Sequence, residues 1–214
     1  MNLYYGEYAG HEIDAVITTR ELVKMIRSAH ISPETLVDIE SDRPMQEGTG
    51  AGVIFGVTGG VMEAALRSAY FILKGKNPDA DAFKPVRSPV FQANDGVMEA
   101  NFQIDDITVR TAVVSGLGNT RRLLEKIDRD EVHYDFVEVM ACPGGCVGGG
   151  GQPIHDGQEL AFTRGQNLYY LDKNAKLRFS HENPDILQMY DEFFEKPLSH
   201  KAHMLLHTEH TIEE

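Results

Sequence analysis

The sequence predicts an α/β fold, in which a parallel-stranded sheet is flanked by helices and followed by a helical C-terminal tail. The main observation is a strand pattern at 107–114, a helical pattern at 119–127 and a second strand pattern at 134–139. Such a strand–helix–strand unit pairs its two strands in parallel. A glycine-rich stretch at 140–152 follows the second strand directly. Ligands of open α/β sheets bind at this carboxyl end of the strands.

The N-terminal segment is predicted to contribute a strand and a helix. Asp14-Ala-Val-Ile-Thr18 is short, apolar and partly β-branched, which indicates a buried strand. Thr18 and Glu21 have the spacing of a capping box, so we expect a helix over 19–30 with Thr18 as its N-cap. Its apolar residues recur at helical spacing, at Leu22, Val23, Ile26 and Ala29.

A glycine-rich stretch and a second helix are expected next. The apolar group at Leu36, Val37 and Ile39 is expected to form a buried turn. Residues 48–60 contain six glycines, which suit a close backbone approach to a ligand or equally a tight packing of loops. A helical pattern begins at Val61 and is expected to end at Lys74-Gly75. Residues 76–90 predict an irregular connection, and the period of 91–102 is ambiguous.

The second half is predicted to hold the strand–helix–strand unit and the tail. Asn119 is expected to cap the helix of that unit. A further helix is expected to start within 159–162, and Asn183-Pro184 predicts another with proline at its first position. Four histidines follow, at positions 200, 203, 207 and 210. Their helical spacing allows a zinc site, although solvated or core histidines fit the pattern as well.

Composition narrows the class of protein. The chain is 42% hydrophobic and 25% charged, as in globular proteins, and its net charge is −13. A negative charge of this size argues against nucleic acid and anionic membranes as partners. No apolar run approaches the roughly 20 residues of a membrane span, and no signal peptide is evident, so we expect no membrane span and a cytoplasmic location.

The only two cysteines, Cys142 and Cys146, lie inside the glycine-rich stretch that follows the last strand. A spacing of four residues can point both thiols to one face, and the glycines leave room for a bulky group and expose N–H donors to it. Three interpretations stay open on these residues alone: a metal or iron–sulfur site, a thiol redox pair, and inert buried cysteines. Ser115-Gly-Leu-Gly118 is only a weak nucleotide-binding signal, because Arg121 replaces the third glycine.

Longer motifs resemble the catalytic subunit of iron-only ([FeFe]) hydrogenases. Val137 to Pro153, with its Met-Ala-Cys-Pro-Gly-Gly-Cys core, is similar to the third H-cluster signature of that family, with one glycine more or a glycine at a variable position. Gly52 to Arg67 is a second long match. Ser180 to Pro184 and His203 to Thr208 resemble the C-terminal segment, which is a separate small subunit in some members.

The resemblance implies roles for five residues. Cys142 would ligate a [4Fe-4S] cluster, and Cys146 would bridge it to the two-iron ([2Fe]) subsite, so that both are metal ligands of the H-cluster. Met140 would pack near the distal iron, and Phe55 and Val61 would line the pocket. The activity implied is reversible reduction of protons to H2, with electrons from ferredoxin or a nicotinamide-linked partner. Dry, apolar side chains suit such a redox centre.

The departures from the family pattern limit this reading. The two earlier signatures of the family, which carry the other cluster ligands and the proton-transfer thiol, have no counterpart in this sequence. We therefore expect one lobe of a two-lobed catalytic domain, as a gene fragment, an internal start or a split subunit, with a missing N-terminal hydrogenase half as partner. The expected division is a catalytic part at 1–175 and a small-subunit-like tail at 176–214.

A non-hydrogenase relative is the competing interpretation. Iron-only-hydrogenase-like proteins of iron–sulfur assembly share a similar cysteine segment, whereas Phe55 to Arg67 and the Leu205-Leu-His-Thr208 tail fit true hydrogenases better. A redox or binding module without a cluster is the third possibility. It predicts an iron-free protein in which Cys142 and Cys146 oxidise to a disulfide.

Overall fold

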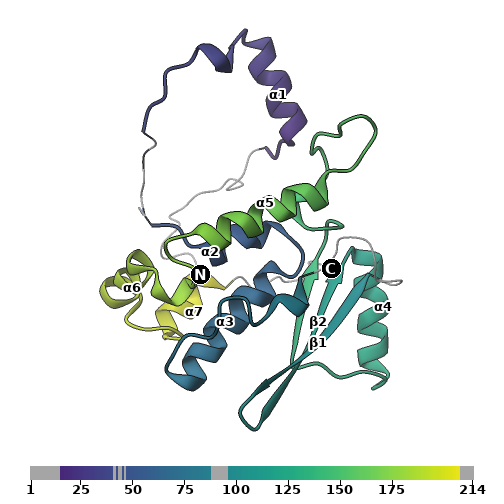
Figure 1. Ribbon diagram of the computed structural model, residues 1–214, viewed down its shortest axis with the longest axis vertical. Coiled ribbons are helices and arrows are strands. Elements are labelled where there is room, and N and C mark those ends of the chain that lie inside the picture. The colour runs from purple at the N-terminus through teal and green to yellow at the C-terminus, as the bar shows by residue number, and fades with distance from the viewer. Residues whose placement is uncertain (1–14, 41, 43–44, 46, 88–95, 208–214) are drawn as a thin grey trace.

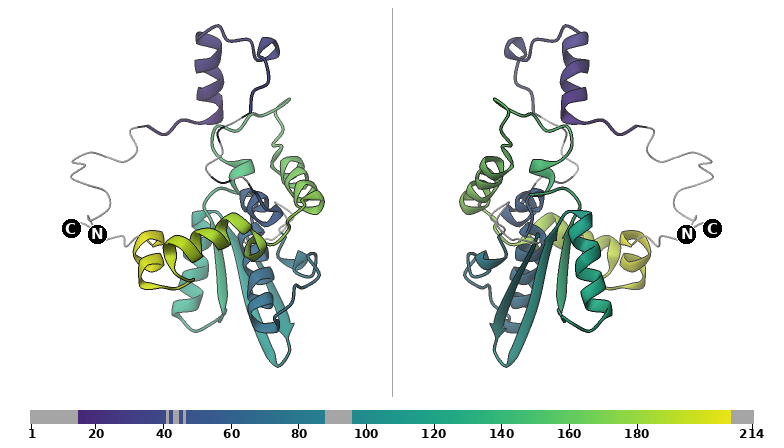
Figure 2. Two further views of the ribbon diagram at one scale, coloured as in Figure 1. Left: turned by 90° about the vertical axis from the view of Figure 1, so that its left-hand side faces the viewer. Right: turned by 90° about the vertical axis from the view of Figure 1, so that its right-hand side faces the viewer.

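The computed structural model describes residues 15–40, 42, 45, 47–87 and 96–207. It confirms the α/β class: a three-stranded sheet carries helix α3 on one face and helix α4 on the other, and a helical tail lies across the molecule from α4 (Figure 1; Figure 2). Among the described residues, no helix has the length and hydropathy needed to cross a membrane.

The sheet has the order β1-β2-β3, with β1 at Val97–Ile104, β2 at Ile107–Ser115 and β3 at Phe136–Met140. Strands β2 and β3 pair in parallel, from Thr111 opposite Phe136 to Ser115 opposite Met140, as the strand–helix–strand pattern predicts. Strand β1 pairs antiparallel with β2 through a tight hairpin. The sheet is therefore mixed, because the ambiguous segment before residue 103 forms an additional edge strand.

The two faces of the sheet each hold a hydrophobic cluster. Helix α3 (Gly60–Lys74) packs Met62 and Leu66 against Val113 of β2. Helix α4 (Leu117–Asp128) packs Leu123 against the neighbouring positions of β2, which face the other way because side chains alternate along a strand. The α3 cluster comprises Met62, Leu66, Tyr70, Phe83, Val86, Ala100, Phe102, Val109, Val113 and Phe136.

Helix α3 ends where the sequence predicts, whereas helix α4 begins earlier than predicted. Helix α3 ends as predicted, with Gly75 in the left-handed conformation. Helix α4 begins two residues before the predicted N-cap, and Gly116 occupies the cap position instead. The side chain of Asn119 still serves the turn, because its amide donates a hydrogen bond to the carbonyl oxygen of Ser115.

The N-terminal helix is confirmed, but the strand before it is not. Helix α1 (Thr19–Ser28) begins with the predicted capping box of Thr18 and Glu21. Among the described residues, 15–18 form no strand, and Val16 is 88% exposed; Asp14 lies outside the described residues. The predicted buried turn is also wrong, since Leu36, Val37 and Ile39 are exposed. Helix α1 projects from the body and buries none of its residues (Figure 1).

The tail expected at 176–214 contains helices among its described residues, and the helix expected to start within 159–162 precedes it. Helix α5 (Ala161–Asn174) packs against the short helix α2 (Gly50–Val53), which lies in the first glycine-rich stretch. Helix α6 (Pro184–Met189) has the predicted N-cap Asn183, and α7 (His200–Leu206) follows a π-helical turn at Tyr190–Phe194. Short 3-10 helices lie at Pro33–Thr35, Ile54–Gly56, Lys84–Val86, Cys146–Gly148 and Ser180–Glu182.

Candidate metal centre

The cysteine segment leaves the carboxyl end of β3, at the edge of the sheet where the sequence predicts it. Two hydrogen bonds fasten the segment to the end of the neighbouring parallel strand. The Gly116 N–H donates to the Met140 carbonyl oxygen at 2.7 Å, and the Gly144 N–H donates to the Ser115 hydroxyl at 3.0 Å. The turn between β2 and α4, at Ser115 and Gly116, thus fixes the position of the cysteine segment.

The two glycine-rich stretches meet at Gly145. This residue has φ +93°, and a Cβ there would lie 2.6 Å from the Gly56 carbonyl oxygen and 2.8 Å from the Thr58 nitrogen. The Thr58 N–H also donates to the Gly144 carbonyl oxygen at 3.3 Å. Glycine is therefore required twice at this position, for its left-handed backbone and for the close approach. Within 48–60, a Cβ at Gly56 would lie 2.7 Å from the Leu168 side chain, so at that glycine the close approach is to another part of the same chain.

The two cysteines lie in the tight turn that follows strand β3. Cys142 is half-buried, Cys146 is exposed, and both are free thiols. A Cβ added at Gly149 would lie 3.7 Å from the Cys142 sulfur, so the glycine run keeps space beside that thiol. Two of the N–H groups that were expected to be open donors already make backbone hydrogen bonds. The Gly148 N–H donates to the Gly145 carbonyl oxygen at 2.9 Å, and the Gly149 N–H donates to the Cys146 carbonyl oxygen at 3.0 Å.

A buried carboxylate ties this segment to helix α3. Glu138, on β3, is 6% exposed and accepts the Gly59 N–H at 2.7 Å and the Met62 N–H at 2.6 Å. Both donors lie at the N-terminal end of α3, where the helix dipole favours a negative charge. Burial raises the pKa of the Glu138 carboxyl, and the two N–H donors offset part of that rise.

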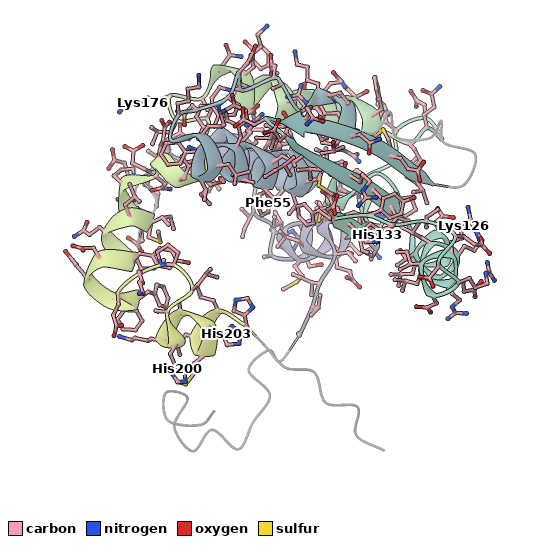
Figure 3. The ribbon with its side chains drawn as sticks, turned by 90° about the horizontal axis from the view of Figure 1, so that it is seen from below. Phe55, Lys126, His133, Lys176, His200 and His203 are labelled. Atoms are coloured by element: carbon pink, nitrogen blue, oxygen red, sulfur yellow. The ribbon has the colours of Figure 1, made fainter. Side chains whose placement is uncertain are left out.

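The three apolar residues assigned to the pocket lie on elements that meet at this edge. Phe55 is in the 3-10 helix at Ile54–Gly56 and is 47% exposed, near the middle of the molecule in Figure 3. Val61 lies in the first turn of α3 and Met140 ends β3, and both are half-buried. Helix α3 contacts both the 3-10 helix and β3.

Few potential metal ligands gather at this site. Among residues 15–40, 42, 45, 47–87 and 96–207, no group of three or more His, Cys, Asp or Glu side chains is placed to hold a metal ion. A four-thiolate iron–sulfur site could take at most two of its ligands from the free thiols of Cys142 and Cys146, which would be half of its ligand set.

Of the other candidate signals, the Ser115 to Gly118 turn adjoins this site and the C-terminal histidines do not. Ser115 to Gly118 forms the turn into α4 and hydrogen-bonds the cysteine segment, which explains its glycine without a nucleotide. On α7 the rings of His203 and His207 lie 4.6 Å apart, and His200 and His203 lie far from Phe55 in Figure 3. The remaining histidine, His210, lies outside the described residues.

The sequence analysis did not predict a buried charge cluster that lies between helices α3 and α5. Glu63 and Arg67 on α3 and Asp172 on α5 are each fully buried. The Arg67 guanidinium binds both oxygens of Asp172 at 2.9 Å and one oxygen of Glu63 at 2.7 Å. The only signal for it in the sequence is the i, i+4 spacing of Glu63 and Arg67, which is usually that of a surface pair.

Two further arginines and an aspartate complete this charge cluster. Arg87 donates to Glu63 at 2.6 and 2.7 Å, and Arg178 donates to Asp172 at 2.6 Å and to Asp81 at 3.1 Å. Burial would raise the pKa of Asp81, but hydrogen bonds from Lys84 and Arg178 outweigh it and lower that pKa to about 2. The cluster therefore sets three arginines and Lys84 against three carboxylates.

Two family models match the chain. The model described as the iron-only hydrogenase large subunit, C-terminal domain, matches residues 4–150, and the one described as the iron hydrogenase small subunit matches residues 158–212. The curated "NADP-reducing hydrogenase subunit HndD" of Solidesulfovibrio fructosivorans is 47% identical over 92% of this chain. The "Cytosolic Fe-S cluster assembly factor narfl" of Xenopus tropicalis is 30% identical over 99% of it.

Solved structures agree with these matches. A variant of [FeFe]-hydrogenase HydA1 from Chlamydomonas reinhardtii superposes with a TM-score of 0.68 and 42% identity over 92% of this chain. The chain spans 55% of that structure, 33% of the Solidesulfovibrio protein and 44% of the Xenopus protein. It thus corresponds to only part of each of these proteins.

Proposed function

The chain belongs to the iron-only hydrogenase family, and from that premise we propose that it forms one half of a hydrogenase active site. The reaction is the reversible reduction of protons to H2. The observation that carries the proposal is the cysteine segment. It follows a strand that pairs in parallel, and it holds two free thiols, with glycines that keep space open beside one of them.

Two thiolates are the chain's contribution to the metal site. Cys142 would ligate the [4Fe-4S] cluster, and Cys146 would bridge that cluster to the two-iron subsite. When bound, this H-cluster would relay electrons from the donor protein to protons. Glu138 is a positioning residue, because its two hydrogen bonds to the start of α3 fix the strand that delivers the thiols.

The apolar residues would exclude water. Phe55, Val61 and Met140 carry no charge, and the surroundings of an iron centre set its potential and its access to solvent. Phe55 and Cys146 are exposed in this chain, although a working site must be dry. We therefore propose that a second polypeptide segment covers them.

That covering segment would also complete the ligand set. A [4Fe-4S] cluster takes four thiolates, and this sequence has two cysteines. Helix α1 projects from the same edge, since the Arg20 N–H donates to the Gly151 carbonyl oxygen at 3.2 Å. The exposed apolar face of α1, with Leu22, Val23 and Met25, fits burial against the segment that carries the other thiols.

The electron donor is proposed from the relatives. A ferredoxin or a NAD(P)H-linked subunit is consistent with the Solidesulfovibrio protein, whose name describes an NADP-reducing hydrogenase subunit. We propose a cytoplasmic location from the cysteine usage, since two cysteines provide no disulfide framework.

A role in iron–sulfur assembly is the second candidate. It is favoured by the match to the Xenopus assembly factor over 99% of the chain, compared with 92% for the Solidesulfovibrio protein. The lower identity of 30% against 47% ranks it second. Such a protein would bind iron and sulfide without evolving H2.

A chimera tests the proposal and separates the two candidates. The matching part of the Solidesulfovibrio protein is replaced by this chain, the product is matured without oxygen, and iron, sulfide and H2 evolution are measured. H2 evolution that is lost in Cys142→Ser and Cys146→Ser supports the hydrogenase role. Iron and sulfide without H2 supports assembly instead. A chimera that folds, as its circular dichroism shows, but binds no iron refutes both roles.

The chain by itself should not be active. We expect no H2 evolution after iron–sulfur reconstitution and maturation, because half of the thiolates lie elsewhere. Activity above that of the Cys142→Ser, Cys146→Ser double variant would show that two thiolates suffice.

A further inference from the structure

The glycine run that follows Cys146 has little stiffness of its own. Residues 148–151 are all glycine, and a Cβ at Gly150 would meet nothing within 4 Å. Glycine loses more backbone freedom on folding than any other residue, so a run of this kind is costly to hold in one conformation. Contacts from outside the run are therefore needed to fix it.

Arg164 of helix α5 supplies such contacts at both ends of the run. One terminal nitrogen of its guanidinium donates to the Val147 carbonyl oxygen at 3.0 Å, and the other donates to the Pro153 carbonyl oxygen. Val147 directly precedes the four glycines, and Pro153 follows them after one residue. A single planar, fork-shaped side chain thus spans the loop and closes it.

The position of Arg164 is fixed by the packing of α5 against both glycine-rich stretches. Ala161, one turn earlier, is buried, and a Cβ at Gly148 would lie 3.0 Å from its Cβ. Leu168, one turn later, lies 2.7 Å from where a Cβ at Gly56 would be. Residues three and four positions apart share one face of a helix. Arg164 therefore reaches the cysteine segment from a well-packed support.

The bond from Arg164 to Val147 acts next to a thiol. Val147 directly follows Cys146, and the Cys146 carbonyl oxygen itself accepts the Gly149 N–H at 3.0 Å and the Gln152 side-chain amide at 3.4 Å. A hydrogen bond from a guanidinium is charge-assisted and stronger than one between neutral groups. Since both carbonyls that follow the Cys146 sulfur are held, the backbone there has little freedom to move that sulfur.

We propose that Arg164 is a positioning residue of the metal centre, which holds Cys146 in place for the two-iron subsite. This role rests on the proposed function, in which Cys146 bridges that subsite to the [4Fe-4S] cluster. A bridging thiolate must reach two groups at once, and hydrogen bonds around a ligand determine its orientation. Arg164 lies within 158–212, the part that matches the small-subunit model, so this part shapes the site without supplying a ligand.

Hydrogen exchange in the iron-free chain tests the clamp itself. Arg164→Lys keeps the positive charge but lacks the fork that reaches both carbonyls, and Arg164→Gln removes the charge as well. In both variants we expect the Gly148 and Gly149 amides to exchange about 10-fold faster, because the turn that protects them opens more often. The control Arg121→Lys makes the same substitution at an exposed position on α4 and should change nothing.

The amides of α3 distinguish a local effect from a global one. They should keep their exchange rates in both Arg164 variants, because α3 makes no bond to this side chain. Unchanged rates at Gly148 and Gly149 overturn the clamp. An equal acceleration in α3 also overturns it, since the whole fold would then be destabilised rather than the turn alone.

Loading of the chimera tests the consequence for the cluster. With Arg164→Lys we expect iron per chain to fall while acid-labile sulfide stays, because the subsite that depends on Cys146 is lost and the [4Fe-4S] cluster is kept by its other thiolates. Full iron content in this variant overturns the positioning role. An unsubstituted chimera that binds no iron overturns the proposed function and this role with it, whereas unchanged exchange in the iron-free chain overturns the clamp alone.

Discussion

The carboxylate of Glu138 offers the sharpest test of how this chain holds its cysteine segment. The residue is almost fully buried and accepts two backbone N–H bonds, at 2.7 Å from Gly59 and 2.6 Å from Met62. Glu138→Ala would leave both buried donors without an acceptor. An unsatisfied buried donor costs about 1–3 kcal/mol, so the two together predict a loss of about 2–6 kcal/mol in the free energy of unfolding.

Glu138→Gln should lie between Ala and the unsubstituted chain. The amide oxygen can accept one of the two N–H bonds, but the amide nitrogen would face the other donor. The expected loss is about 1–3 kcal/mol. The reduced protein is unfolded in urea and followed by far-ultraviolet circular dichroism, because the chain has no tryptophan. Glu125→Gln, at an exposed position on α4, is the control and should change the stability by less than about 0.5 kcal/mol.

A local measurement separates positioning from general stability. Cys142 is half-buried and Cys146 is exposed, so a thiol reagent distinguishes them in the folded protein. Release of β3 from α3 should expose Cys142 and speed its reaction several-fold, while the rate at Cys146 stays the same. A stability loss below about 1 kcal/mol in Glu138→Ala, or a larger loss in Gln than in Ala, would refute the reasoning.

Three other predictions concern different parts of the fold. Gly145→Ala should cost about 3 kcal/mol or more by urea unfolding, because its Cβ would meet the Gly56 carbonyl oxygen, whereas Gly150→Ala, with open space around it, should be neutral within about 0.5 kcal/mol. The folded pKa of Asp81 is about 2 and an unfolded aspartate titrates near 4, so its ion pairs stabilise the fold above about pH 4 and are lost as the pH falls towards 2. Asp81→Asn should remove about 1–2 kcal/mol of that pH dependence, and an unaltered acid-unfolding curve would contradict it. Thr18→Ala removes the N-cap of α1, so amides of that helix should exchange about 5-fold faster without a change in global stability; a large global loss would show that α1 is packed.

The elements that were predicted correctly are those whose signals are local. Helix α3 is specified by apolar spacing and by the glycine that ends it, and the β2–α4–β3 unit by its alternating periods. The carboxyl-edge position of Cys142 and Cys146 follows from that unit. Thr18 and Glu21 specify the start of α1 in the same way, because a capping box needs no tertiary partner.

The failures have a common physical cause. Asp14 to Thr18 has the composition of a strand, but a strand also requires a neighbour, and Val16 finds none. Strand β1 was missed because its pairing with β2, not its own pattern, makes it a strand. The Arg67–Asp172 pair joins residues 105 positions apart, so no local pattern could reveal it.

The buried charge cluster makes helices α3 and α5 dependent on each other. Arg67 and Asp172 are both fully buried and lie 105 positions apart in the sequence. A buried charge that loses its partner is strongly destabilising. Replacement of one member alone would therefore favour a second replacement at the other, so the two positions are expected to change together as related sequences diverge.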